Sequence, residues 1–296
     1  MKTITPTISQ LRMLSSIKGQ RWAIRPEAVE EFALSALDLA ENSAVMDDPD
    51  FQNQRAPMFM DADGIAHIEI TGALLNKVAQ IYERNGLATA YSTIIRETQA
   101  AKDAGAIGII YHVDSPGGTV AGVVEAGAAI ANAGIPTAAF CHGLSCSAAY
   151  WLTSGTNAII ATPSATVGNI GAILSWADCS AFWEGMGVKF KALVSEGADL
   201  KSTFHLEPDE AQLAFLQESI NEAGTAFREH VTTGRAAAGV TMDDEVWRAG
   251  WYSGKRAGQL GLVDDIGGME TARERLLEVA KNFPLAIRQA SMKSRQ

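Results

Sequence analysis

Apolar and polar residues along the chain form short apolar runs separated by glycine-rich turns and by segments with helical spacing. The apolar runs, bounded by turn residues, predict buried strands, and apolar positions three or four apart predict helices. Strands are expected over residues 107–113, 136–141, 158–161 and 190–194. Helices are expected over 120–133, 147–155, 178–187, 208–238, 243–249 and 269–281. Because strands alternate with helices, the pattern predicts an α/β fold with a mainly parallel sheet covered by helices.

The two ends of the chain differ from this alternating region. Residues 26–43 have helical spacing with Pro26 in the first turn, and the polar stretch 47–57 is typical of a linker. An Asp63–Gly64 turn then precedes an alternating strand. We therefore expect a helical N-terminal segment and linker over 1–56, one folded domain over 57–281 and a flexible tail over 282–296.

Composition excludes several classes of function. The chain has 296 residues, a net charge of −10 and a pI near 5.0, which argues against nucleic-acid binding because that needs a basic surface. Cys141, Cys146 and Cys179 form neither a disulfide framework nor a zinc-binding pair, so we expect no metal and no cofactor. No apolar run suits a signal peptide or a membrane span, which predicts a cytoplasmic protein without membrane attachment.

The first candidate for chemistry is a serine at the predicted start of a helix, in the run Cys-His-Gly-Leu-Ser-Cys-Ser-Ala-Ala-Tyr-Trp (141–151). A serine there commonly only caps the helix, and this interpretation applies to Ser145 as well as Ser147. Ser147 is also placed as a nucleophile, because a helix N-terminus favours developing negative charge. Small residues beside it, Ala148 among them, predict a shallow apolar pocket for a short aliphatic side chain. Cys146 is an alternative nucleophile.

The second candidate is the turn Asp-Ser-Pro-Gly-Gly-Thr (114–119), between a buried strand and a helix. Gly117 and Gly118 can adopt positive φ angles and let a substrate approach backbone N–H groups. Such a turn can form an oxyanion hole, or it can be a plain strand-to-helix connection.

A base is the third requirement. Lys201 lies in the loop Ser-Glu-Gly-Ala-Asp-Leu-Lys-Ser-Thr (195–203). A lysine acts as a base only where burial or a neighbouring cation lowers its pKa, and nearby Glu196 and Asp199 act in the opposite direction. His142, five residues before Ser147, is the alternative base, in a Ser–His–Asp site.

Five sequence runs together resemble the signal peptide peptidase A family, and more closely its phage head-protease branch. They are Asp-Ser-Pro-Gly-Gly-Thr-Val (114–120), Ser-Ala-Ala-Tyr-Trp-Leu (147–152), Ala-Thr-Pro-Ser-Ala-Thr-Val-Gly-Asn-Ile-Gly-Ala-Ile (161–173), Gly-Ala-Asp-Leu-Lys-Ser (197–202) and Trp-Tyr-Ser-Gly-Lys-Arg-Ala with Leu-Gly-Leu-Val-Asp-Asp-Ile-Gly-Gly (251–257 and 260–268). The resemblance implies a ClpP/crotonase-like fold and a peptidase domain over 57–281.

The resemblance also implies residue roles. It places the nucleophile at Ser147, the general base at Lys201, and the oxyanion hole at Gly117 and Gly118 with the backbone near Ala148. Many family members carry a serine that orients the lysine, and this chain has Asn169 at that position. An asparagine can donate or accept a hydrogen bond, so Asn169 is expected to orient Lys201.

The implied function is a Ser–Lys endopeptidase that processes phage capsid or scaffold proteins during prohead assembly. Its expected partners are peptide and protein substrates, with scaffold and portal proteins among them, in the host cytoplasm or the procapsid. Proteins of this fold form rings, and the helix over 208–238 has apolar positions that a neighbour could cover, so a homo-oligomer is expected. Two alternatives stay open, a catalytically inactive capsid-assembly protein and a crotonase-type acyl-CoA enzyme.

Overall fold

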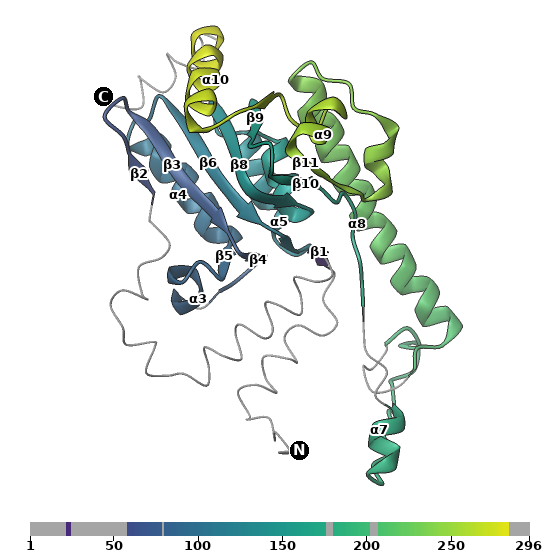
Figure 1. Cartoon of the computed structure of the whole chain (residues 1–296). Coiled ribbons are helices and arrows are strands. Elements are labelled where there is room, and N and C mark those ends of the chain that lie inside the picture. Colours follow the sequence, from purple (N-terminus) through teal and green to yellow (C-terminus); the bar gives the residue numbers. More distant parts are fainter. Residues whose placement is uncertain (1–21, 25–57, 79, 176–179, 202–206, 284–296) are drawn as a thin grey trace, which may run out of the picture.

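A twisted, mainly parallel sheet forms the centre of the computed structural model, which describes residues 22–24, 58–78, 80–175, 180–201 and 207–283 (Figure 1). Strands β3, β6, β8, β9, β10 and β12 pair in parallel, and β2 and β11 pair antiparallel to β3 and β10. Their bounds are β2 Phe59–Met60, β3 Ile65–Thr71, β6 Gly108–Ser115, β8 Thr137–Cys146, β9 Ala158–Ala161, β10 Thr166–Gly168, β11 Trp251–Ser253 and β12 Asp265–Ile266. The predicted α/β fold with a mainly parallel sheet is confirmed.

Side-chain alternation along each strand builds a core on both faces of this sheet. Ile109 and Tyr111 point to the face covered by α4 (Tyr91–Asp103), α5 (Val123–Ala131) and α6 (Ala148–Ser154), whereas Ile110 points to the opposite face. That opposite face packs against Ala272 and Leu276 of α10 (Met269–Asn282). Because both faces are covered there, the first halves of β6 and β8 are buried without interruption, as the apolar runs in the sequence predict.

A smaller four-stranded sheet lies at the carboxyl end of β6. Its order is β1 (Trp22–Ile24), β7 (Gly117–Thr119), β4 (Ala73–Leu75) and β5 (Ala88–Ala90). β4 pairs in parallel with β5 and β7, and β1 pairs antiparallel to β7. The short helix α3 (Gln80–Arg84) leads into β5.

The secondary structure differs from the expectations in several places, of which two are informative. Residues 190–194 form no strand, because within the described part of the chain no strand lies beside them, and Leu193 is fully exposed. Helix α4 was not predicted, although its buried residues Tyr91, Ile94, Thr98 and Ala101 follow helical spacing. The helix expected over 26–43 lies outside the described residues.

Helix α8 (Glu210–Ala237) extends from the body of the molecule, with α7 (Ser180–Gly185) beyond its N-terminal end (Figure 1). It begins with a reciprocal cap, in which the Asp209 side chain accepts from the Gln212 N–H and the Gln212 side chain accepts from the Asp209 N–H. Towards its other end, Phe227 stacks on Trp151 of α6 with ring centroids 4.6 Å apart. We call α7, the loop after it and the N-terminal half of α8 the arm.

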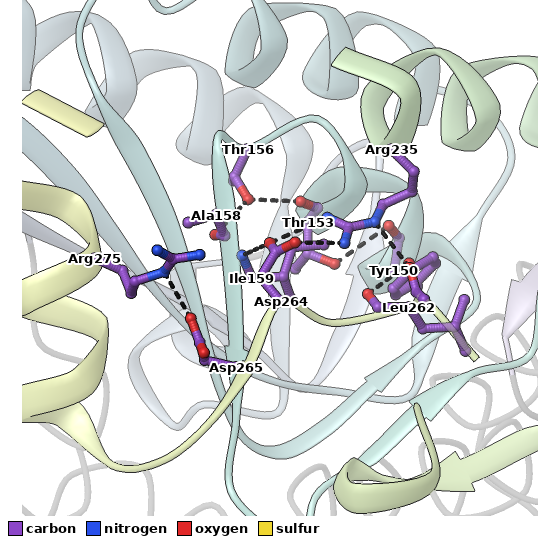
Figure 2. Close-up of polar contacts among 11 residues, drawn as sticks. Tyr150, Thr153, Thr156, Ala158, Ile159, Arg235, Leu262, Asp264, Asp265 and Arg275 are labelled. Carbon is purple, nitrogen blue, oxygen red and sulfur yellow. Dashed lines mark hydrogen bonds and ion pairs between the residues drawn. The ribbon is translucent and has the colours of Figure 1, made fainter. Parts of the chain in front are cut away.

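A buried ion pair fixes the C-terminal end of α8 (Figure 2). The Arg235 side chain is fully buried and donates from Nη2 to Asp264 Oδ1 at 2.6 Å and from Nη1 to Oδ2 at 3.2 Å. Its Nε donates to the Gly261 carbonyl at 3.1 Å. Asp264 Oδ2 also accepts from the Ile159 N–H of β9 at 2.7 Å. The Arg235–Asp264 pair therefore connects α8, the central sheet and the segment after α9 (Gly254–Gln259).

Candidate active site

Ser147 lies where β8 ends and α6 begins, in a backbone conformation that serine rarely adopts. Its φ is 54° and its ψ is −121°. A non-glycine residue at such angles is strained, and strain of this kind concentrates at functional sites. The Ser147 N–H donates to the Gly168 carbonyl at 2.8 Å, which fixes the turn from the β10 side. A sharp strand-to-helix turn is the geometry that presents a serine nucleophile at the end of a sheet.

The environment of the Ser147 hydroxyl is enclosed. The residue is 1% exposed, and its Oγ donates to the Gly171 carbonyl at 3.5 Å, the long limit of a hydrogen bond. Ala148 and Ala149, the next two residues, are fully buried. Since no strong bond holds the hydroxyl, it can turn towards another acceptor.

The glycine turn lies beside Ser147. In the parallel ladder between β6 and β8, Ser115 lies opposite Ser145. Two residues further along the chain, Gly117 begins β7 and Ser147 precedes α6, and β7 contacts α6. The Ser115 side chain shapes the turn, because its Oγ donates to the Gly72 carbonyl at 2.7 Å and accepts from the Gly117 N–H at 3.2 Å.

Gly117 and Gly118 each need to be glycine for a different reason. Gly117 has a φ of 111°, which lies outside the range that side chains tolerate. A Cβ on Gly118 would lie 1.8 Å from the Leu74 carbonyl oxygen, so only glycine permits the close approach of β7 to β4. Ala148, the first residue of α6, has an N–H without an acceptor inside its helix. β7 contacts α6, so these glycines lie near the helix start that follows Ser147.

Asn169 lies next to this site and has a structural contact. Its φ is 58°, its N–H donates to the Gly250 carbonyl at 2.7 Å, and its Nδ2 donates to the Ala249 carbonyl at 2.9 Å. The side chain therefore attaches the end of β10 to the segment before β11. Because Gly168 accepts the Ser147 N–H, Asn169 supports the turn that carries the serine.

Lys201 lies on the arm and not beside Ser147 of the same chain. It is exposed, and its N–H closes a turn to the Ala198 carbonyl at 3.0 Å. The neighbouring Asp199 carbonyl accepts from Gln212 Nε2 at 2.9 Å, which places this loop at the N-terminal end of α8. From Gln212 to Phe227, the contact with α6, the helix rises about 22 Å at 1.5 Å per residue.

The alternative residues have other surroundings. Ser145 is buried inside β8, where its Oγ lies 3.3 Å from the Thr153 hydroxyl. Cys146 is buried and its Sγ donates to the Thr166 carbonyl at 3.5 Å. His142 lies against the Phe140 ring, and the strand from His142 to Cys146 spans about 13 Å. His142 is therefore too far along β8 to hydrogen-bond to Ser147 as a base.

Metal-binding clusters and membrane-spanning helices are both absent from the described residues. Among them, no group of three or more His, Cys, Asp or Glu side chains is arranged to hold a metal ion. No helix in the same part of the chain is both long enough and apolar enough to span a bilayer.

Comparison with known proteins identifies a family. The sequence model of peptidase family S49 matches residues 129–282, which include Ser147, Asn169 and Lys201. Capsid assembly protease C of Escherichia phage lambda is 30% identical over 247 residues, covering 81% of this chain and 54% of that protein. A putative signal peptide peptidase SppA of Enterococcus faecium is 32% identical over 196 residues, covering 63% and 54%. Head-tail preconnector protein GP5 of Enterobacteria phage P21 is 27% identical over 217 residues, covering 71% and 42%. The chain thus spans about half the length of the relatives it matches.

Proposed function

Because this chain belongs to peptidase family S49, we propose that it is a serine endopeptidase in which Ser147 attacks the peptide carbonyl. The observation that carries the proposal is the strained turn at Ser147, with a φ of 54°, beside two glycines and a helix N-terminus. These are the parts that acyl transfer needs, a positioned hydroxyl and backbone donors aimed at the developing oxyanion. The peptidase domain predicted over 57–281 and the tail over 282–296 remain part of the proposal.

The proposed reaction has two acyl-transfer steps. Neutral Lys201 accepts the Ser147 proton while Oγ forms a bond to the carbonyl carbon, and the carbonyl oxygen becomes an oxyanion held by the N–H groups of Gly118 and Ala148. The intermediate collapses, the C–N bond breaks, and the lysine gives its proton to the leaving amine. Water then attacks the acyl-serine with the same lysine as base, which releases the acid and restores Ser147. Asn169 is proposed to act on this site through the backbone that holds the Ser147 turn.

We propose that the lysine of each dyad comes from a neighbouring copy of the chain. The arm holds Lys201 on an exposed loop, about 22 Å along α8 from its contact with α6. A base must lie within hydrogen-bond reach of the nucleophile. Docking the arm of one copy onto the body of the next would both bury Lys201 and bring it to Ser147.

The surface of the arm supports such an assembly. An open groove of about 570 Å³ lies between residues 172–174 and α8, and Leu213 and Ile220 line it. Leu193, Leu213 and Phe215 expose large apolar side chains, which soluble monomers rarely gather on one segment. A homo-oligomer, the expectation from the sequence, would cover this surface.

The biological role that we propose is processing of capsid or scaffold proteins during assembly of a phage head. It is supported by the names of two relatives, a capsid assembly protease and a head-tail preconnector protein. Substrates and partners would then be phage head proteins such as scaffold and portal, within the procapsid or the host cytoplasm.

Purified wild type, Ser147→Ala and Lys201→Ala test the proposal, with casein hydrolysis and intact mass as readouts. We expect wild type to cleave and both variants to be inactive, while the matched control Ser145→Ala, two residues earlier on β8, keeps its activity. After subunit exchange, an equal mixture of Ser147→Ala and Lys201→Ala should recover about a quarter of wild-type activity, because that share of sites combines an intact serine with an intact lysine from its neighbour.

The other outcomes separate the alternatives. Activity in Ser147→Ala would remove this serine from the mechanism. An inactive mixture beside an active wild type would place both residues in one chain. A folded wild type that cleaves none of the peptides would favour the inactive assembly protein or the acyl-CoA enzyme.

A further inference from the structure

The N-terminal strand β1 occupies the edge of the oxyanion strand. Trp22, Ala23 and Ile24 pair antiparallel with Thr119, Gly118 and Gly117. The other edge of β7 is taken by β4, where Leu74 lies opposite Gly118. β7 is held at its end by Tyr91, whose hydroxyl donates to the Thr119 carbonyl at 2.7 Å. The outer edge of β7 is therefore held in a fixed position, and β1, from the N-terminal part of the chain, pairs with it.

That edge is where an extended peptide would have to lie for attack by Ser147. β7 contacts α6, whose start follows Ser147, and Ile24 lies opposite Gly117 at the beginning of β7. A protein that binds peptides in extended form commonly adds them as a strand to an open sheet edge, with main-chain bonds for affinity and side-chain pockets for specificity. β1 thus lies at the position that such a peptide would take.

The Ile24 side chain also fills an apolar pocket. Its side chain is 2% exposed and packs with Ala73 and Ala88, which are buried, and with the partly buried Leu75, Val78 and Tyr82. The walls are apolar and two of them are alanines, so the pocket has room for one aliphatic side chain. This small cluster is separate from the two cores that cover the main sheet.

We propose that β1 is an intramolecular occupant of the peptide-binding edge, so that the N-terminal segment competes with substrate and the Ile24 pocket selects peptides with a β-branched aliphatic residue. This inference rests on the proposed function only in treating the competing peptide as a substrate. The binding competition itself requires no catalysis. A tethered strand acts at an effective concentration on the order of 1 mM, so with an intrinsic Kd of β1 for this edge on the order of 100 μM, a competing peptide would bind about tenfold more weakly while β1 is in place.

A binding experiment on the full chain tests this competition. The probe is a fluorescein-labelled peptide with the sequence of residues 20–26, Gln-Arg-Trp-Ala-Ile-Arg-Pro, and the control probe carries Asp in place of Ile. Both are titrated into Ser147→Ala protein, which prevents cleavage, and into the same protein with Ile24→Asp, Ile24→Ala or Ile24→Val. Fluorescence polarisation gives each Kd, and hydrogen exchange reports on the amides of Gly117–Thr119.

We expect the peptide to bind the Ile24→Asp and Ile24→Ala proteins about tenfold more tightly than the Ile24 protein, with Ile24→Val unchanged and the Asp-containing probe binding none of them. The amides of Gly117–Thr119 should exchange faster in the Ile24→Asp and Ile24→Ala proteins, and at the unchanged rate in the Ile24→Val protein. The same affinity for all four proteins, or no binding by a folded Ile24→Ala protein, would overturn the proposal. If the wild-type protein failed to hydrolyse casein, that would count against the proposed peptidase activity. It would not change the conclusion from the peptide-binding measurements.

Discussion

Replacing Arg235 with methionine should destabilise the protein more than any surface ion-pair substitution. The guanidinium is fully buried and makes three hydrogen bonds, two to Asp264 and one to the Gly261 carbonyl. Methionine fills much of the volume of the arginine side chain, but it leaves the Asp264 carboxylate, whose side chain is 9% exposed, without a cation. Removing one partner of a buried pair typically costs about 3–5 kcal/mol, because the remaining charge is uncompensated.

Urea unfolding followed by tryptophan fluorescence measures this cost, and two further variants interpret it. Asp264→Asn keeps an acceptor for the Ile159 N–H, so the double variant Arg235→Met/Asp264→Asn removes both charges and should lose at least about 2 kcal/mol less than the sum of the singles. Arg256→Met is the control, because its pair with Glu245 is about half exposed and should contribute less than about 1 kcal/mol. Equal losses for Arg235→Met and Arg256→Met, or additive losses in the double variant, would refute the reasoning.

Three further predictions concern single side chains. Ser147→Gly should be more stable than Ser147→Ala by about 1 kcal/mol, because glycine relieves a φ of 54°; equal urea midpoints would show that the turn is unstrained. Burial, with His67 and His142 nearby, lowers the pKa of His112 from 6.5 to about 4, so protonation favours the unfolded chain and stability should fall between pH 6.5 and 4. In thermal melts, the Tm of His112→Gln should fall less between pH 6.5 and 4 than the Tm of wild type. An equal fall would assign the pH dependence to other groups. Burial raises the pKa of the Cys141 thiol to about 12, so iodoacetamide at pH 8 should modify Cys141 only after unfolding, and modification of the native protein would contradict this.

What could be predicted from the sequence was local in the chain. The Ser147 turn and the Gly117–Gly118 turn each follow a strand within one short run, so a strand–turn–helix pattern was enough to find them. Residues 190–194 show the limit of the same method. Their apolar residues have the composition of a strand, but a strand needs a neighbour to pair with, and the arm provides none among the described residues.

Contacts between distant parts of the chain were not accessible in this way. The position of Lys201 depends on the direction of α8, which is set by Arg235 and Asp264 far from the lysine in sequence. The partner of Asn169 lies eighty residues later, at Ala249. The pairing of Ile24 with Gly117 likewise joins two segments that share no sequence pattern.

Helix α6 has a consequence for when this protein can act. All seven of its residues, Ala148–Ser154, are buried, and a helix of that length is not stable by itself in water. It forms only when the sheet on one side and α5 and α8 on the other are already in place. The turn that carries Ser147 therefore depends on tertiary packing, and a nascent or partly folded chain is expected to lack the geometry of the proposed nucleophile.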